Sequence, residues 1–245
     1  MNPIIPAAAI LTAFCTVPAA VCAADTTKKG YGQGTAVDSM NRPCGAAEFN
    51  ERYADLGAFA LSQDSSRVII TFDQGYENGF TGRILDTLRD KNVQAVFFLT
   101  GDYAKKEPEL VRRMIAEGHT IGNHGMTHAS LPSLSEEAAR EEIMSLHDYV
   151  MNNYGVQMQY FRCPCGEYSD AALGTVRDCG YKSVFWSYAY VDWKTDSQPG
   201  REEALNKLLD SAHGGEILLL HSVSETNAEI LGDLIDGLRE KGFKV

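Results

Sequence analysis

The sequence predicts an α/β fold, a closed or incompletely closed parallel (β/α) barrel with about seven strands. From residue 67 onward, short apolar runs rich in β-branched and aromatic residues alternate with amphipathic helical patterns. Apolar runs of this kind are typical of strands buried on both faces. Strands that alternate with helices are joined by crossovers and form a parallel sheet. The chain of 245 residues is long enough for one sizeable domain.

The segment before residue 67 has the weakest secondary-structure patterns in the sequence. A Gly-rich stretch at residues 31–34 predicts irregular backbone, and residues 48–63 have the pattern of a short helix. Seven buried strands are then expected in order, at residues 68–72, 93–99, 119–122, 159–161, 181–186, 217–220 and 243–245.

Two of the intervening helices have clear signals. Ser133 and Glu136 predict a capping box, which would begin the first of them. Its apolar face would be formed by Ala139, Ile143, Leu146 and Val150. The last helix has the same spacing of apolar residues, at Leu231, Leu234, Ile235 and Leu238. Gly242 is expected to end it.

The first 24 residues carry no charged side chain and are apolar or small from residue 4 onward. Small residues at positions 21–24 suit a signal-peptidase site, so we expect export. An uncleaved N-terminal membrane anchor is the alternative, because about 20 apolar residues span a bilayer. Four cysteines follow this segment, namely Cys44, Cys163, Cys165 and Cys179. They allow three disulfide pairings, and free thiols are the alternative.

Composition excludes several classes of protein. The net charge is −11, from 33 acidic and 22 basic residues, whereas nucleic-acid binders carry a basic excess or stripe. The sequence contains neither G-x-G-x-x-G nor a Walker loop. Dinucleotide-binding and P-loop proteins are therefore excluded as well.

Reactive residues follow the predicted strands closely. They are Asp73 after the first strand, His124 and His128 after the third, Arg162 after the fourth, Asp192 and Trp193 after the fifth, and His221 after the sixth. In a parallel barrel these strand ends share one face, where active sites are built. We therefore expect these residues to converge in an enzyme active site.

The residue types indicate hydrolytic chemistry. His124 and His128 are four apart, so one helical turn would place both imidazoles on one face, as a metal site requires. Asp73 is a candidate general base, and His221 is a candidate general acid with an ordinary pKa of about 6.5. Taken singly, Asp73 is as well explained as a helix N-cap and His221 as a hydrogen-bonded residue at a strand end. Their convergence at one rim favours catalysis.

Five short motifs occur in a defined order: TFDQG (71–75), HGMTH (124–128), RCPCG (162–166), DW (192–193) and LLH (219–221). In these motifs the chain resembles the polysaccharide deacetylases of the NodB-homology group. The strings TFDQGYENGFTGRIL, FWSYAYVDWKTD and LLLHSVSETNAEIL resemble a narrower branch, the delta-lactam-biosynthetic de-N-acetylases. The resemblance extends from about residue 31 to residue 245 and implies a distorted (β/α) barrel with fewer than eight regular units.

The resemblance also implies roles for the residues of the first three motifs. Asp73 would be the catalytic base, and Arg162 would pair with it and orient it. His124 and His128 would bind a divalent metal, usually zinc. Most members have an Asp as the third metal ligand, where this chain has Gln74. A neutral amide is a weaker ligand than a carboxylate, so weaker metal binding is expected.

The remaining motifs would complete the site. His221 would protonate the leaving amine, and Asp192 would either hold Arg162 or tune His221. Trp193 and Leu219 would line the pocket for the acetyl group. The main-chain N–H of Cys165 would donate to the developing oxyanion.

The resemblance thus implies metal-dependent hydrolysis of the N-acetyl group of N-acetylmuramic acid in peptidoglycan, leading to muramic δ-lactam in the spore cortex. We expect a signal peptide or anchor at residues 1–24, an N-terminal extension packed on the barrel at 25–66, and a polysaccharide deacetylase catalytic domain at 67–245. The protein would act as a monomer on glycan strands outside the cytoplasmic membrane. The alternatives are a deacetylase of peptidoglycan N-acetylglucosamine or chitin oligomers, and a non-catalytic glycan-binding protein.

Overall fold

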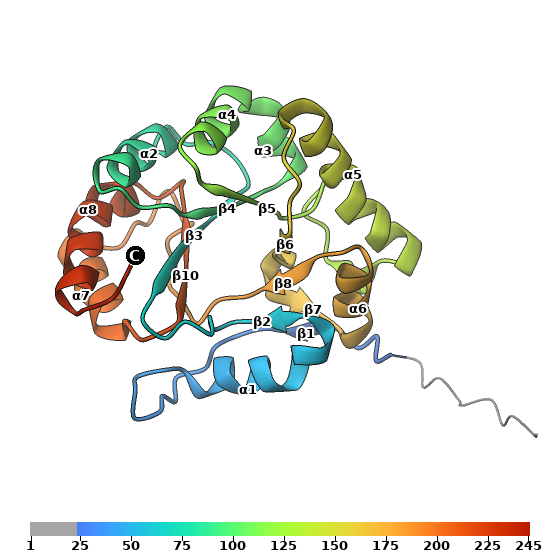
Figure 1. Ribbon diagram of the computed structural model, residues 1–245, viewed down its shortest axis with the longest axis horizontal. Coiled ribbons are helices and arrows are strands. Elements are labelled where there is room, and N and C mark those ends of the chain that lie inside the picture. Colours follow the sequence, from blue (N-terminus) through green and yellow to red (C-terminus); the bar gives the residue numbers. More distant parts are fainter. Residues whose placement is uncertain (1–23) are drawn as a thin grey trace, which may run out of the picture.

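A computed structural model of the protein describes residues 24–245 (Figure 1). The predicted signal peptide or anchor therefore lies outside the described residues, apart from its last position. The main sheet has the strand order β2-β8-β6-β5-β4-β3-β10-β9, and neighbouring strands pair in parallel throughout. Within the described residues no pairing joins β2 to β9. The sheet consequently curls into a barrel that stays partly open, as the sequence predicted.

The strands are short, and most are buried on both faces. Their bounds are β2 (Ala58–Phe59), β3 (Val68–Gln74), β4 (Val96–Leu99), β5 (Thr120–Asn123), β6 (Tyr160–Phe161), β8 (Lys182–Val184), β9 (Tyr188–Ala189) and β10 (Glu216–His221). The longest pairing joins β3 to β10 and places Asp73 directly beside His221. Two reactive residues that are far apart in the sequence are thus neighbours at the carboxyl end of the sheet.

The helices surround the sheet and bury their apolar faces against it (Figure 1). Their bounds are α1 (Cys44–Tyr53), α2 (Thr81–Asp90), α3 (Gly101–Lys106), α4 (Pro108–Ala116), α5 (Glu136–Tyr154), α6 (Asp170–Asp178), α7 (Arg201–Ser211) and α8 (Glu225–Glu240). Three 3₁₀ turns occur as well, at Ala54–Leu56, Leu131–Ser133 and Pro164–Gly166. None of the helices in residues 24–245 is long and apolar enough to cross a membrane.

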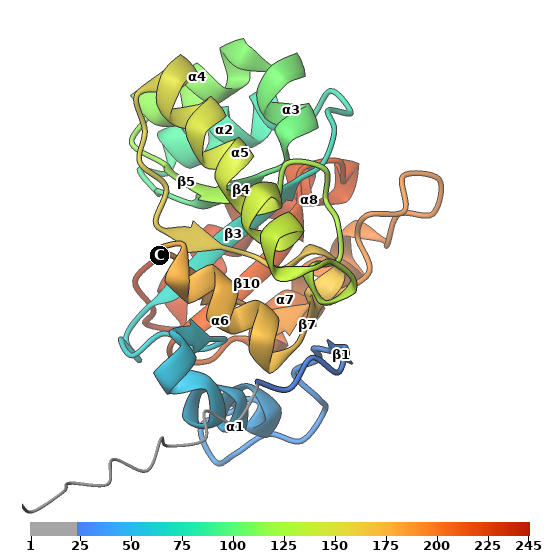
Figure 2. The same cartoon turned by 90° about the vertical axis from the view of Figure 1, so that its right-hand side faces the viewer.

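The segment before residue 67 is more closely tied to the barrel than its weak signals suggest. β1 (Lys29–Gly30) pairs with β7 (Glu167–Tyr168) in an antiparallel ladder. Helix α1 buries Ala46, Phe49 and Tyr53 in the main core, and Figure 2 shows it lying along one side of the molecule. β2 is the first strand of the sheet. The division at residues 66 and 67 remains a prediction.

Several predicted elements are wrong in detail. The helix expected at 48–63 is α1, which begins at Cys44 and ends at Tyr53. The strand expected at 243–245 is reduced to a single bridge between Lys244 and Arg67. The helix expected after Ser133 is capped by Ser135 instead, whose Oγ accepts a hydrogen bond from the N–H of Ala138 at 3.2 Å. Ser133 belongs to the preceding 3₁₀ turn.

Candidate active site

A cavity of about 900 Å³ opens at the carboxyl ends of the strands. Seven of the residues predicted from the sequence line it, namely Asp73, His124, His128, Cys165, Trp193, Leu219 and His221. The other three, Gln74, Arg162 and Asp192, are fully buried behind this lining. The predicted residues therefore converge at one end of the barrel, in two layers.

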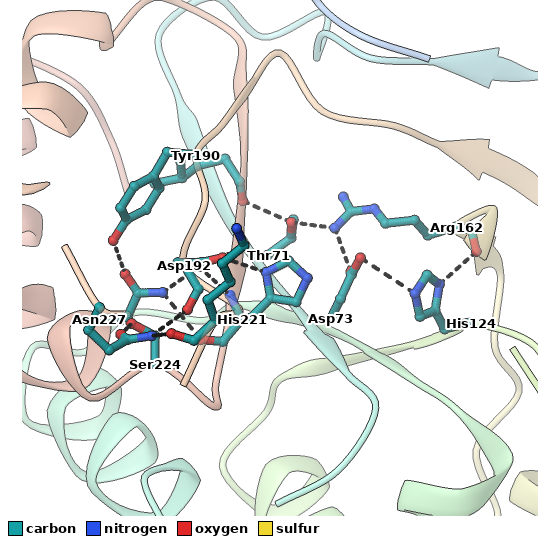
Figure 3. Close-up of polar contacts among 12 residues, drawn as sticks. Thr71, Asp73, His124, Arg162, Tyr190, Asp192, His221, Ser224 and Asn227 are labelled. Atoms are coloured by element: carbon teal, nitrogen blue, oxygen red, sulfur yellow. Dashed lines mark hydrogen bonds and ion pairs between the residues drawn. The ribbon is translucent and has the colours of Figure 1, made fainter. Parts of the chain in front are cut away.

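Asp73 and Arg162 form a buried ion pair beneath the cavity (Figure 3). Arg162 Nη1 lies 2.8 Å from Asp73 Oδ1 and also donates to Thr71 Oγ1. The remaining guanidinium N–H groups donate to the carbonyls of Val184 and Phe185. Burial is the largest influence and would raise the pKa of Asp73, but the charge and hydrogen bond of Arg162, together with the nearby His124 and His221 rings, outweigh it and hold this pKa below its usual value. The carboxylate is therefore ionised and has a fixed orientation.

His124 and His128 lie together in the loop after β5, with ring centroids 4.7 Å apart. The expected helical turn is absent there: His128 has a φ of 62°, and the loop itself brings the rings together. The carbonyl of Arg162 lies 2.8 Å from His124 Nδ1, so that nitrogen carries the proton. Burial lowers the pKa of His124 to about 4, which keeps the ring neutral. His124 Nε2 consequently retains a free lone pair, 3.6 Å from Asp73 Oδ2.

A divalent metal fits these residues. Two neutral imidazoles on one short loop are suitable nitrogen ligands. Gln74 donates through Nε2 to Ser222 Oγ, which leaves its buried Oε1 without a hydrogen-bond partner. An unpartnered buried carbonyl oxygen is available as a ligand. Within residues 24–245, however, no three His, Cys, Asp or Glu side chains cluster in a metal-binding arrangement.

His221 and Asp192 form a second pair on the other side of Asp73 (Figure 3). Asp192 Oδ1 lies 2.7 Å from His221 Nδ1, and Asp192 Oδ2 accepts the His221 main-chain N–H at 2.8 Å. Burial alone would lower the pKa of His221, but the hydrogen bond and charge of Asp192 raise it. Of the two contacts expected for Asp192, the structure contains the one with His221. No hydrogen bond joins Asp192 to Arg162 in the described part of the chain.

Apolar side chains form the rim of the cavity. Trp193 is 47% exposed, and its ring centroid lies 5.5 Å from that of His221. It belongs to the loop between β9 and α7, which projects from the molecule in Figure 2. Leu219 and Cys165 also line the cavity, and Cys165 has a φ of 58°. The four described cysteines are free thiols.

Three residues that contribute to the site were missed from the sequence. Thr71 accepts a hydrogen bond from Arg162, and Asn227 contacts Asp192. Glu142 accepts hydrogen bonds from Thr127 and Ala129, which flank His128. Glu142 had a signal, because it lies on the same helical face as the apolar residues of α5. Thr71 lies in the TFDQG motif and Asn227 in the LLLHSVSETNAEIL string, but the sequence analysis assigned neither of them a role.

An Asp–Arg pair, two adjacent imidazoles and an Asp–His pair thus lie at one cavity of a parallel (β/α) barrel, and these are residue types that hydrolases use for acid–base and metal chemistry. Residues 61–184 match the Polysaccharide deacetylase family, and the chain belongs to it. Deacetylases of this family are metal-dependent in general.

Individual relatives agree with this assignment. The chain is 39% identical over 203 residues to the peptidoglycan-N-acetylmuramic acid deacetylase PdaA of Bacillus subtilis. The matched region covers 82% of this chain and 77% of PdaA. The solved structure of PdaA, a family 4 carbohydrate esterase, superposes with a TM-score of 0.84 at 36% identity and covers 89% of this chain and 94% of that chain. The structure of a family 4 carbohydrate esterase from Bacillus anthracis superposes with a TM-score of 0.75, also at 36% identity. The superposition covers 91% of this chain and 95% of that chain. These comparisons confirm the predicted family, barrel fold and enzyme class.

Proposed function

We propose that the protein hydrolyses the N-acetyl group of N-acetylmuramic acid in peptidoglycan, and that the freed amine goes on to form muramic δ-lactam in the spore cortex. The observation that carries this proposal is the in-register placement of Asp73 and His221 on β3 and β10, at the base of one cavity. The substrate is suggested by the 39% identity to PdaA, a peptidoglycan-N-acetylmuramic acid deacetylase.

In this proposal Asp73 and His221 divide the proton transfers. Asp73 is ionised and accepts a proton from the water that attacks the acetamide carbonyl. Arg162 holds the carboxylate in place through its 2.8 Å contact. His221 faces the same space and gives its proton to the amine as the C–N bond breaks. The raised pKa of His221 keeps that proton available. The products are acetate and a free amine.

His124 and His128 would hold the metal, with Gln74 as a weak third ligand. We propose zinc, because imidazole is among its preferred ligands. The bound metal would polarise the acetamide carbonyl and lower the pKa of the attacking water. The main-chain N–H of Cys165 would donate to the developing oxyanion. Trp193 and Leu219 would enclose the acetyl methyl group, since both line the cavity.

We further propose that the protein acts as a monomer outside the cytoplasmic membrane, where the substrate lies. Residues 1–24 would direct export or anchor the chain, residues 25–66 would pack on the barrel, and residues 67–245 would carry the catalysis. Each of these assignments follows from the sequence pattern and the proposed substrate.

Substrate preference tests the proposal. Purified protein with Zn²⁺ is incubated separately with peptide-stripped peptidoglycan and with N-acetylglucosamine oligomers, and acetate and new amines are assigned to each sugar. We expect release from muramic residues. Release from glucosamine residues alone would replace the proposed substrate with an N-acetylglucosamine polymer. Retained glycan affinity with no acetate release under any divalent metal would instead indicate a glycan-binding protein.

A further inference from the structure

The Asp192 carboxylate is fully buried and has no cationic partner other than His221 among the described residues. Its Oδ1 contacts His221 Nδ1. Its Oδ2 accepts two hydrogen bonds, from the His221 main-chain N–H at 2.8 Å and from Asn227 Nδ2 at 2.6 Å. A buried carboxylate needs such donors to remain ionised and in place. Asn227 is the only side chain other than His221 that supplies one in the described structure.

The orientation of the Asn227 amide is determined by its surroundings. Asn227 is 1% exposed and lies in the first turn of α8. Its Nδ2 faces two acceptors, Asp192 Oδ2 and the His221 carbonyl at 3.2 Å. Its Oδ1 accepts a hydrogen bond from the Tyr190 hydroxyl. A flipped amide would direct its oxygen at both acceptors, so only one orientation is compatible with these contacts.

The backbone around Asn227 is also fixed. The Asn227 N–H donates to Ser224 Oγ, the N-cap of α8, at 3.0 Å. Ser224 Oγ donates to Gln198 Oε1, and Gln198 Nε2 donates to the carbonyl of Asp192 at 2.8 Å. The start of α8 therefore holds Asp192 through both its side chain and its main chain, as part of one network (Figure 3).

We infer that Asn227 is a positioning residue for proton donation by His221. Asn227 fixes the Asp192 carboxylate, the carboxylate fixes the proton on His221 Nδ1, and Nε2 is thereby directed to the cavity. Figure 3 shows the His221 ring extending from Asp192 toward Asp73, as this arrangement requires. Asn227 itself does not line the cavity, so it acts through Asp192. The inference rests on the proposed role of His221 as the proton donor.

The leaving group provides a test that a merely structural role would not pass. Expulsion of an amine requires a proton, whereas 4-nitrophenolate leaves an acetate ester without one. Asn227→Leu removes the donor and keeps the branching at Cγ and the number of side-chain heavy atoms. We expect it to lower kcat on the glycan amide about tenfold or more, with KM within twofold, because general acid catalysis contributes about 10²–10⁴-fold. Hydrolysis of 4-nitrophenyl acetate should stay within about threefold of wild type, because that step does not draw on the general acid.

Thr226→Val is the matched control. Thr226 is buried in the same helical turn and donates to the carbonyl of Pro199 at 2.8 Å, but it does not contact Asp192. This variant should retain both activities. Equal losses on amide and ester in Asn227→Leu, or no loss on the amide, would overturn the inference.

Nitrogen NMR of His221 keeps the test independent of the substrate. Wild type should show the Nδ1–H tautomer, and Asn227→Leu should show a mixture of tautomers. If wild type deacetylates no glycan, the proposed function fails, while the tautomer comparison still decides the role of Asn227. An unchanged tautomer in Asn227→Leu would overturn that role.

Discussion

At the scale of single residues, the buried pair of Asp73 and Arg162 connects stability to chemistry. The Arg162 guanidinium lies 4.1 Å from the centroid of the Phe98 ring, and its N–H groups donate to one side-chain oxygen, one carboxylate and two carbonyls. Such an ion requires a complete set of partners, because a buried charge without compensation is strongly destabilising. The pair is therefore expected to behave as a unit.

Arg162→Met tests this expectation. We expect it to lower the free energy of unfolding by about 3–5 kcal/mol, because Asp73 would be left as an uncompensated buried charge. Urea denaturation provides the measurement. The double variant Arg162→Met/Asp73→Asn should recover part of the loss, since it removes both charges. Simple addition of the two single losses would show that the residues do not form an energetic unit.

His221 and Asp192 predict a pH dependence. A raised pKa in the folded state contributes stability that is fully present below the unfolded value of about 6.5 and is lost as the pH rises through the folded value. A general acid loses activity over that same upper range. Asp192→Asn should therefore move the basic limb of the kcat profile to lower pH, because it removes the charge and the charge-assisted hydrogen bond that raise the pKa of His221. A limb that stays in place would exclude His221 as the group that titrates there.

At the scale of elements, helix α5 organises the loop that carries the two imidazoles. Glu142 Oε1 accepts the Thr127 N–H at 2.7 Å and the Ala129 N–H at 3.2 Å, and Glu142 Oε2 accepts the Thr127 hydroxyl at 2.9 Å. One carboxylate thus replaces the hydrogen bonds that a helical turn would have provided. This explains how His128 can lie beside His124 without a helix.

Glu142→Ala should weaken metal binding by about 10–100-fold, the usual effect of losing a group that orients a metal ligand. Titration calorimetry with Zn²⁺ measures this directly, without a substrate. The neighbouring Glu141 is exposed on the same helix, and Glu141→Ala provides the control. Equal affinities in the two variants would show that Glu142 does not support the metal site.

The elements that the sequence missed share a physical cause. β2 and β9 contain two residues each, as does the predicted β6, so strands of this length have little periodicity from which to predict them. Residues 243–245 are apolar enough for a strand, but only Lys244 pairs in the described structure. Ser133 and Ser135 both precede apolar helical positions, and the 3₁₀ turn at Leu131–Ser133 places the cap at the second of them. Local patterns predicted the long strands well and the short contacts poorly.

At the scale of the whole molecule, the parallel topology of the sheet explains why the site residues could be predicted from the sequence. All ten predicted site residues lie in the cavity lining or directly behind it, because each lies in the carboxyl-terminal half of a strand of one sheet or in the loop that follows. The motifs identified the reactive groups, while their partners depended on tertiary contacts. Asn227 is such a partner, since it lies on α8 and contacts Asp192 in the loop after β9. Sequence spacing carries no information on that contact.

The overall charge predicts a dependence on salt. The net charge is −11, and none of the residues lining the cavity is Lys or Arg. Long-range electrostatics therefore do not attract the protein to an anionic cell wall. Raising the ionic strength from about 0.01 to 0.15 M should lower the KM for peptidoglycan, because the Debye length shortens from about 30 to 8 Å. The KM for a neutral N-acetylated oligosaccharide should not change, and a rise in the KM for peptidoglycan would contradict the prediction.

The most direct test of the central claim is mass spectrometry of peptide-stripped, muramic-containing glycan after incubation with the purified protein, with added Zn²⁺ and separately with EDTA. Wild type should remove one acetyl group from muramic residues only with metal, and a further loss of water would indicate lactam closure. Asp73→Asn should lower this activity at least about 100-fold under conditions where circular dichroism shows the variant to be folded, because it removes the general base at constant size. An unchanged glycan mass in both conditions, or full activity in Asp73→Asn, would contradict metal-dependent muramic deacetylation at this site.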